Sequence, residues 1–158
     1  MNKKTTDNQI LQFHQQIVEL IKKYQFRDRN QICCFGISVS QCYVLEALHT
    51  HGPLTMNELA KKMYLKISTM TRVVEQLVKK KYVKREEGLD DRRVRFINLT
   101  KQGRAIYKNA WENIFESEKV ILKNIPAEHK AVLIDVLRKL NQAVSSWQSC
   151  CEIPAAKS

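Results

Sequence analysis

Residues 54–77 read LTMNELAKKMYLKISTMTRVVEQL, and this stretch decides the fold. Thr55 precedes Glu58 by three residues, which is the spacing of a capping box at the start of a helix. The segment 64–66 then interrupts the helical pattern, and Ser68 can cap a second, longer helix. Two helices separated by so few residues predict a helix-turn-helix.

The residues that follow predict a β-hairpin. Segments 82–85 and 94–99 are rich in β-branched and aromatic side chains, and a polar, turn-forming segment, 86–93, lies between them. A hairpin directly after a helix-turn-helix has the position of a wing. Thr100 can then cap a long helix, and Pro126 suits the first turn of a last one.

Helical periodicity also precedes the helix-turn-helix. Apolar side chains recur at three- and four-residue steps over 8–26, the pattern breaks over 27–36, and another helix covers 38–49 before Gly52. The fold class that we predict is therefore mostly α with a small β-hairpin.

The predicted organisation is a winged helix-turn-helix DNA-binding domain at 37–103 and a helical dimerisation region formed by 1–36 and 104–158. Two long C-terminal helices cannot cover their apolar residues against one small domain, so we expect a homodimer. Such a dimer would place two recognition helices about one turn of DNA, ~34 Å, apart. The expected partner is therefore double-stranded DNA with a pseudo-palindromic operator.

The positive charge is unevenly distributed. The 158 residues carry a formal charge of +11, and residues 54–104 hold 14 Lys and Arg against six Asp and Glu, whereas the flanks are near neutral. Such a basic segment favours a polyanionic partner such as DNA. No apolar run approaches the roughly 18 residues that span a bilayer, and no signal peptide is evident. We therefore expect a cytoplasmic protein without a membrane partner.

One face of the helix after Lys66 suits base reading. Met70, Val74 and Leu77 cluster on one side, and polar side chains fall opposite or at the boundary. An arginine can bind guanine through two hydrogen bonds, and a threonine methyl can contact thymine. A solvated helix face without a special role is the alternative, but the neighbouring helix and hairpin argue against it. The candidate DNA-binding residues here are Ser68, Thr69, Thr71, Arg72, Gln76 and Lys79.

The predicted hairpin adds a second set of candidate DNA-binding residues, Arg92, Arg93 and Arg95. A narrow DNA groove between phosphates attracts an inserted arginine. Asp91 would support the wing if its carboxylate pairs with an arginine and fixes its direction. The alternative is a charged turn held by ordinary surface pairs, each worth about 1 kcal/mol or less.

Three motifs together resemble the MarR family of transcriptional regulators. Segment 54–60 is similar to the first helix of the family's helix-turn-helix, 68–77 is similar to its recognition helix, and 91–93 followed by 99–103 is similar to its wing signature, Asp-x-Arg and then Leu-Thr-x-x-Gly. The chain departs from the family at Lys81, where glycine is usual.

The resemblance implies a dimeric, triangular winged-helix protein whose first and last two helices form the dimerisation region. It also implies that Arg93 enters the minor groove and that Asp91 orients it. Most members repress promoters and release DNA when a ligand, a metal or an oxidant acts.

The five cysteines are the remaining signal: Cys33, Cys34, Cys42, Cys150 and Cys151. They could bind a thiophilic metal or metalloid ion as an effector, sense oxidants, or be inert buried thiols. The adjacent pairs slightly favour an ion over a redox switch. The spacing matches no standard zinc pattern, and no cofactor is required by the sequence.

Two other functional classes fit the sequence less well. No glycine-rich phosphate loop, nucleophile elbow or apolar carboxylate pair is present, so we expect no enzyme. A winged helix can instead serve as a protein-interaction module without specific DNA binding. The basic segment, with arginine in both the recognition helix and the wing, favours a sequence-specific DNA-binding regulator, expected to be a repressor released by a ligand, a soft ion or an oxidant.

Overall fold

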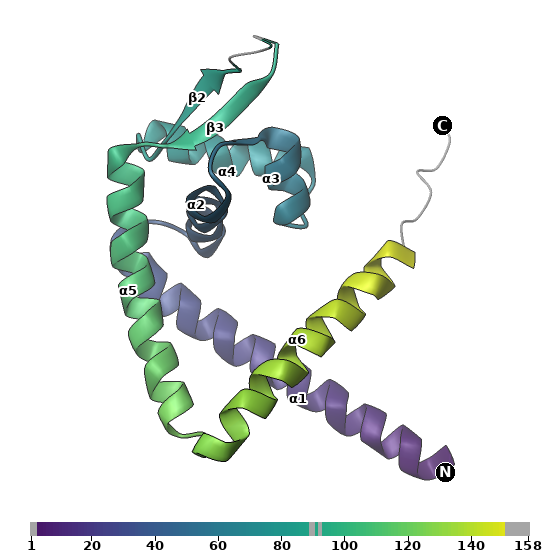
Figure 1. The fold of residues 1–158 in the computed structure, drawn as a ribbon. Helices are drawn as coiled ribbons and strands as arrows, with labels where there is room; N and C mark the ends of the chain where they lie inside the picture. The colour runs from purple at the N-terminus through teal and green to yellow at the C-terminus, as the bar shows by residue number, and fades with distance from the viewer. Residues whose placement is uncertain (1–2, 89–90, 92, 151–158) are drawn as a thin grey trace. The chain divides into compact units, whose positions relative to one another are not determined.

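The computed structural model describes residues 3–88, 91 and 93–150, and it divides into two compact units, Met1–Phe115 and Glu116–Ser158. The first unit contains the helix-turn-helix and the hairpin (Figure 1). The elements are α1 Lys3–Ile32, a 3-10 turn η1 Cys33–Phe35, α2 Val39–His51, β1 Leu54–Thr55, α3 Met56–Lys62, α4 Ile67–Lys79, β2 Val83–Glu87, β3 Arg95–Leu99, α5 Lys101–Lys123 and α6 Ala127–Cys150. The predicted fold class, mostly α with a small hairpin, is confirmed.

The first helix is longer than its apolar pattern predicted. The pattern broke after residue 26, but α1 continues to Ile32, whose side chain is fully buried. The polar residues of this extension can remain helical because Asp28, also buried, is hydrogen-bonded to Arg27 and to Tyr43 of α2. A buried polar group with partners costs little, so the tertiary contact overrides the local pattern.

The helix-turn-helix is made by α3 and α4. The capping box predicted at Thr55 is present: its hydroxyl accepts from the Glu58 amide, and the Glu58 carboxylate accepts from the Thr55 amide at 2.8 Å. The predicted cap of the second helix is wrong. The N-cap lies two residues earlier, at Lys66, which makes no side-chain cap hydrogen bond, so Ser68 lies inside the first turn with its side chain exposed.

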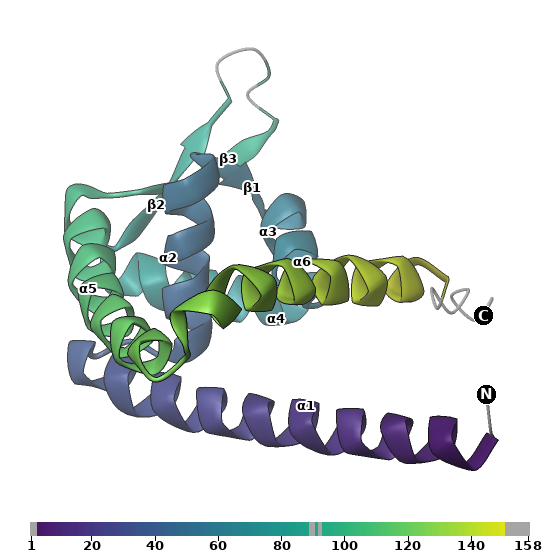
Figure 2. The ribbon, with the colours of Figure 1, turned by 60° about the horizontal axis from the view of Figure 1, so that its bottom comes forward.

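The sheet has three strands rather than the two expected. The hairpin strands β2 and β3 pair from Val83 opposite Leu99 to Glu87 opposite Arg95. The extra strand, β1, pairs Leu54 with Ile97, so the order is β1-β3-β2 (Figure 2). Because β1 leads directly into α3, the middle of β3 is paired with the residues that begin the helix-turn-helix.

A close backbone crossing joins the sheet to α5. Thr100 accepts from the Gly103 amide at 3.0 Å and donates to the Lys81 carbonyl at 2.7 Å, so it caps α5 as predicted. A Cβ placed on Gly103 would lie 1.9 Å from the Tyr82 carbonyl oxygen. The Leu-Thr-x-x-Gly motif therefore has a physical account: Leu99 is buried in the core, Thr100 caps, and the glycine allows the helix to touch the backbone at Tyr82.

One core serves the first unit. Its buried residues come from the end of α1, the segment before α2, α2 itself, the helix-turn-helix, the sheet and the start of α5. The largest fully buried side chains are Ile32, Leu45, Leu48, Leu59, Met70, Leu77 and Ile97. This core holds α4 by its apolar side.

Among the described residues, no single helix is long and apolar enough to cross a membrane. One pair of helices, Thr6–Phe35 with Val39–His51, meets the length and composition criteria jointly, but it is bent by 80°.

Candidate DNA-binding surface

The two faces of α4 differ sharply in exposure. Met70, Val74 and Leu77 are fully buried, and Val73 packs partly against them. The opposite side is exposed, and it carries five of the predicted DNA-binding residues: Ser68, Thr69, Arg72, Gln76 and Lys79. The helix thus presents hydroxyls and a guanidinium near its N-terminus, where free amide groups and the helix dipole also favour a phosphate.

The sixth predicted residue of this helix, Thr71, lies at the boundary. Its side chain is half-buried, and its hydroxyl donates to the Ile67 carbonyl at 2.9 Å. Because that hydrogen bond occupies the hydroxyl proton, Thr71 can offer a base its methyl group and an accepting hydroxyl oxygen, but no donor.

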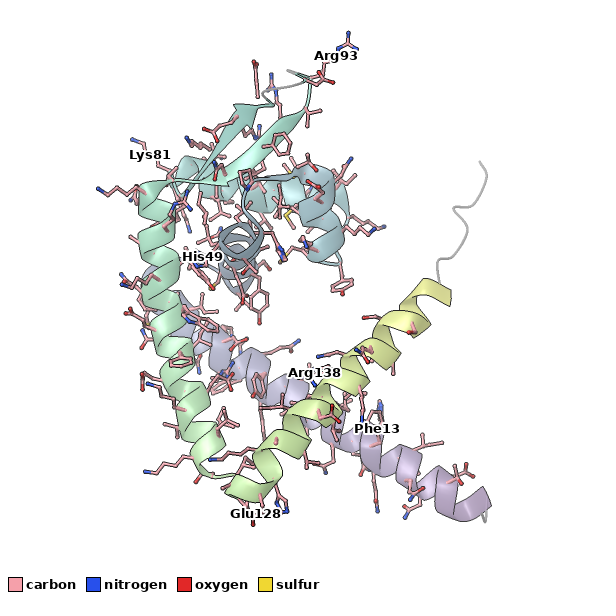
Figure 3. The ribbon with its side chains drawn as sticks, viewed as in Figure 1. Phe13, His49, Lys81, Arg93, Glu128 and Arg138 are labelled. Carbon is pink, nitrogen blue, oxygen red and sulfur yellow. The ribbon has the colours of Figure 1, made fainter. Side chains whose placement is uncertain are left out.

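The wing places Arg93 at the far end of the hairpin, with its side chain exposed (Figure 3). The Asp91 carboxylate accepts from the backbone amide of Arg93 at 2.8 Å. The amide of Val94 donates to the Asp91 carbonyl at 3.1 Å, which closes the turn. Asp91 therefore holds the backbone of the wing at Arg93, and its predicted pairing with an arginine guanidinium stays a prediction. Arg95 is exposed at the start of β3, and Arg92 lies outside the described residues.

The basic side chains of the hairpin differ in whether they have an acidic partner. Lys84 forms an ion pair with Glu86, and Asn98 donates to the same carboxylate at 2.8 Å. The contact with Lys84 has the larger effect on the pKa of Glu86, which it lowers, and the hydrogen bond from Asn98 lowers it further. The Lys84 charge is thus balanced by a neighbour on the same strand, whereas Arg93 and Arg95 form no ion pair with any other residue that the structure describes.

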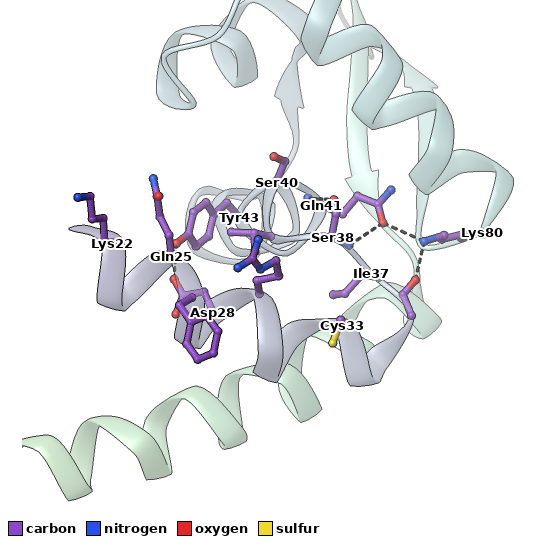
Figure 4. A pocket seen from close by; sticks show the side chains of 14 residues that line it. Lys22, Gln25, Asp28, Cys33, Ile37, Ser38, Ser40, Gln41, Tyr43 and Lys80 are labelled. Carbon is purple, nitrogen blue, oxygen red and sulfur yellow. Dashed lines mark hydrogen bonds between the residues drawn. The ribbon is translucent and has the colours of Figure 1, made fainter. Parts of the chain in front are cut away.

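A lysine at the other end of the recognition helix makes a contact that the sequence did not predict. Lys80, the C-cap of α4, donates to the Gly36 carbonyl at 2.6 Å and to the Gln41 side chain at 2.9 Å (Figure 4). Gln41 is itself buried and accepts from the Ser38 amide in the capping box of α2. Lys80 thereby ties the end of α4 to the turn between α1 and α2.

The same turn borders a broad pocket. Its volume is about 960 Å³, and its walls come from the C-terminal half of α1, the η1 turn, the start of α2 and Lys80. Figure 4 shows the side chains of these elements around it. Lysine, arginine, aspartate and tyrosine side chains line it together with apolar ones.

A smaller cavity of about 160 Å³ lies between α1, α2 and α5. Burial and the nearby Asp28 raise the pKa of Glu46. Tyr43 donates to the Asp28 carboxylate at 2.7 Å, and burial followed by that hydrogen bond raises the pKa of its hydroxyl. Tyr107, which stacks on Trp111, closes the cavity from α5, and burial raises its pKa to about 12.

The cysteines separate into different environments. Cys42 is buried, and burial followed by Glu46 and Asp28 raises the pKa of its thiol to about 12. Cys33 and Cys34 are exposed on the η1 turn. Cys151 and the side chain of Cys150 lie outside the described residues. Within the residues that the structure describes, no group of three or more His, Cys, Asp or Glu side chains could hold a metal ion.

The comparisons with known proteins agree with this architecture. The model of the MarR family matches residues 37–94. The HTH-type transcriptional regulator YsmB of Bacillus subtilis is 30% identical over 106 residues, which cover 67% of this chain and 73% of YsmB.

The chain belongs to the MarR family.

Two further relatives extend the match. The HTH-type transcriptional regulator YdgJ of Bacillus subtilis is 29% identical over 132 residues, 80% of each chain. The fold is also that of FabT of Streptococcus pneumoniae, solved in complex with DNA, with a TM-score of 0.77 over 87% of this chain and 99% of that one, at 20% identity. The protein is therefore a MarR-family transcriptional regulator with a DNA-binding winged helix, and its family and relatives are regulators rather than enzymes.

Proposed function

We propose that this protein is a homodimeric repressor that reads a pseudo-palindromic operator with α4 in the major groove and with Arg93 in the minor groove. The observation that carries the proposal is the exposed face of α4, with Arg72 on one side of a helix whose other side is buried in the core. That face and the wing belong to one unit, joined through β1 and β3. The FabT structure supports it, because a protein of this fold was solved with DNA bound.

The proposed dimer rests on exposed apolar side chains outside the winged helix. Isolated exposed apolar residues are ordinary, but rows of them on long helices mark an interface. They occur on α1, on the second half of α5 and on α6: Ile10, Leu11, Phe13, Leu20, Ile21, Phe26, Phe115, Val120, Ile121, Val132, Ile134, Val136, Leu137 and Val144.

We further propose that an effector releases the protein from its operator. The candidates are a small molecule, a thiophilic metal or metalloid ion, or an oxidant. The broad pocket supports a small molecule, because it lies against the turn that Lys80 binds. The exposed thiols of Cys33 and Cys34 support the other two, whereas the raised pKa keeps Cys42 a thiol near neutral pH.

The test is a titration of the purified protein onto the DNA upstream of its own gene, at several salt concentrations. Arg72→Ala should weaken specific binding by about 10- to 100-fold and relax the preference at one base pair per half-site. Arg93→Ala should weaken binding to all sequences and reduce the salt slope by about one per subunit, or about two for the dimer. Arg138→Ala is the matched control, because it removes the same charge from α6.

A different result would favour the protein-interaction alternative. If neither Arg72→Ala nor Arg93→Ala changes DNA affinity or its salt dependence while both variants stay folded, the proposed reading surface is wrong.

A further inference from the structure

The η1 turn holds two neighbouring thiols in one place. Cys33 and Cys34 are both exposed, and both sulfur atoms hydrogen-bond the same acceptor, the carbonyl oxygen of Asn30, at 3.3 and 3.5 Å. Two atoms that share one acceptor lie on one side of the turn and near each other. The turn is closed behind them, because the Gly36 amide donates to the Cys33 carbonyl at 2.9 Å and Gly36 adopts a φ of 66°.

The geometry of neighbouring residues favours one class of thiol chemistry. Consecutive Cα atoms are about 3.8 Å apart across a trans peptide, whereas disulfides usually join Cα atoms roughly 4.4 to 6.8 Å apart. A bond between the two sulfurs would thus strain the turn. An atom that bridges both sulfurs lets the two sulfurs stay further apart than a direct S–S bond does, so the Cα separation is no obstacle. Soft thiolate ligands also select soft acceptors. The pair therefore suits a bidentate thiophilic centre better than an internal disulfide.

The turn is also connected to the recognition helix. Gly36 directly follows η1, and its carbonyl accepts from Lys80 at the C-terminal end of α4. Lys80 has a second partner, Gln41, in the first turn of α2. A movement of η1 would therefore change the position of the Gly36 carbonyl and remove one of the two anchors of that end of α4.

We propose that Cys33 and Cys34 form a dithiol site for a trivalent metalloid group, and that occupation of this site is transmitted to α4 through the contact between Gly36 and Lys80. With a monosubstituted arsenic(III) oxide, two As–S bonds form, the As–O bonds break, and the two thiol protons leave with the oxygen as water. No oxidation or reduction occurs. Both S–H donors to Asn30 are lost in this step, which removes two contacts that hold the turn in its present form. This inference rests on the proposed DNA-binding function.

The experiment uses phenylarsine oxide as the probe. Since Cys150 and Cys151 are also neighbours in the sequence, the background is the full chain carrying Cys150→Ser and Cys151→Ser. Intact mass should show one phenylarsenic group per chain, and operator affinity should fall at least tenfold. Cys34→Ser in this background should abolish both effects. Cys42→Ser is the matched control and should preserve both, because that thiol is buried.

Lys80→Met tests the transmission separately from the site. The variant should still take up one phenylarsenic group, but the ratio of its operator affinities with and without the probe should approach one. That ratio is independent of any change in its basal affinity, so it distinguishes a positioning role from a loss of stability.

Three outcomes would overturn the inference. If the untreated protein binds its operator but takes up no arsenical, or if uptake persists in Cys34→Ser, the dithiol site is wrong and the proposed function stands. If release by the probe is undiminished in Lys80→Met, the transmission through Gly36 is wrong. If the untreated protein binds no operator, the proposed function fails as well.

Discussion

Adding a single methyl group at Gly103 should strongly destabilise the fold. A methyl group there would collide with the Tyr82 carbonyl, which is backbone and cannot rotate away. Gly103→Ala should therefore lower the free energy of unfolding by about 2 kcal/mol or more, measured by chemical denaturation. Gln102→Ala is the control in the same turn; its side chain is exposed, and it should change stability by less than about 0.5 kcal/mol. Equal stabilities for the two variants would refute the close crossing.

Glu46 should make the protein less stable as the pH rises, which is the opposite of the usual effect of a glutamate. Its pKa is raised in the folded protein. Its contribution to the free energy of unfolding is therefore fully present below the ordinary glutamate pKa and is lost as the pH rises through the raised value. Glu46→Gln should thus raise the midpoint of thermal unfolding at pH 7.5, and the gain should shrink toward pH 4.

Glu58 provides the comparison of opposite sign. Its backbone and side-chain hydrogen bonds to Thr55 lower its pKa, so its contribution is present above the ordinary pKa and is lost as the pH falls through the lowered value. Glu58→Gln should therefore destabilise at pH 7.5, and this loss should shrink in acid. Parallel pH profiles for the two variants would contradict the assignment.

At the scale of the element, both helices of the helix-turn-helix end on a residue with positive φ. Tyr64 follows α3 with a φ of 52°, and Lys81 follows α4 with a φ of 58°. The Tyr82 amide donates to the Leu77 carbonyl, and the Lys81 amide to that of Val78, which closes the helix end around a left-handed residue. The lysine at the position where the family usually has glycine leaves this turn geometry intact.

Lys81→Gly should consequently stabilise the protein. A non-glycine residue in the left-handed region costs about 1 kcal/mol or more, and glycine removes this cost. Glycine also makes the unfolded chain more flexible, which lowers the free energy of unfolding by about 0.4–1 kcal/mol. The net change should be a small rise in the unfolding midpoint, measured by calorimetry. Lys79→Gly, two residues earlier and inside the helix, should instead cost about 1 kcal/mol. A destabilised Lys81→Gly variant would show that the left-handed turn carries no strain.

The sequence predicted the elements whose signals are local. Thr55 and Glu58 are three residues apart, and Thr100 directly precedes a long helical pattern, so both caps could be identified from the local sequence. The two-residue strand β1 could not, because only its pairing with Ile97 makes it a strand. The extension of α1 depends on a hydrogen bond between Asp28 and Tyr43, and the anchoring of Lys80 on Gly36 joins residues 44 positions apart. Neither contact leaves a periodic pattern in the chain.

At the scale of the whole molecule, we expect a dimer at micromolar concentration. Ile21 of α1 is about half exposed in the single chain, and apolar side chains of this kind are covered by a symmetric partner. Ile21→Asp should therefore lower the molar mass measured by light scattering toward that of one chain. Gln16→Asp, on an exposed position of the same helix, should leave it unchanged. A wild-type protein that is monomeric throughout would refute the proposed dimer.

The strand order has a consequence for synthesis. The middle strand, β3, is the last of the three to leave the ribosome, after β1, both helices of the helix-turn-helix and β2 have emerged. Until Ile97 and Leu99 are added, Leu54 and Val83 have no strand between them to pair with. A nascent chain halted within the wing would carry the recognition-helix sequence but would lack Ile97 and Leu99 of the core against which that helix packs. The three-stranded sheet that joins the wing to the recognition helix can therefore close only after residues 95–99 have been made.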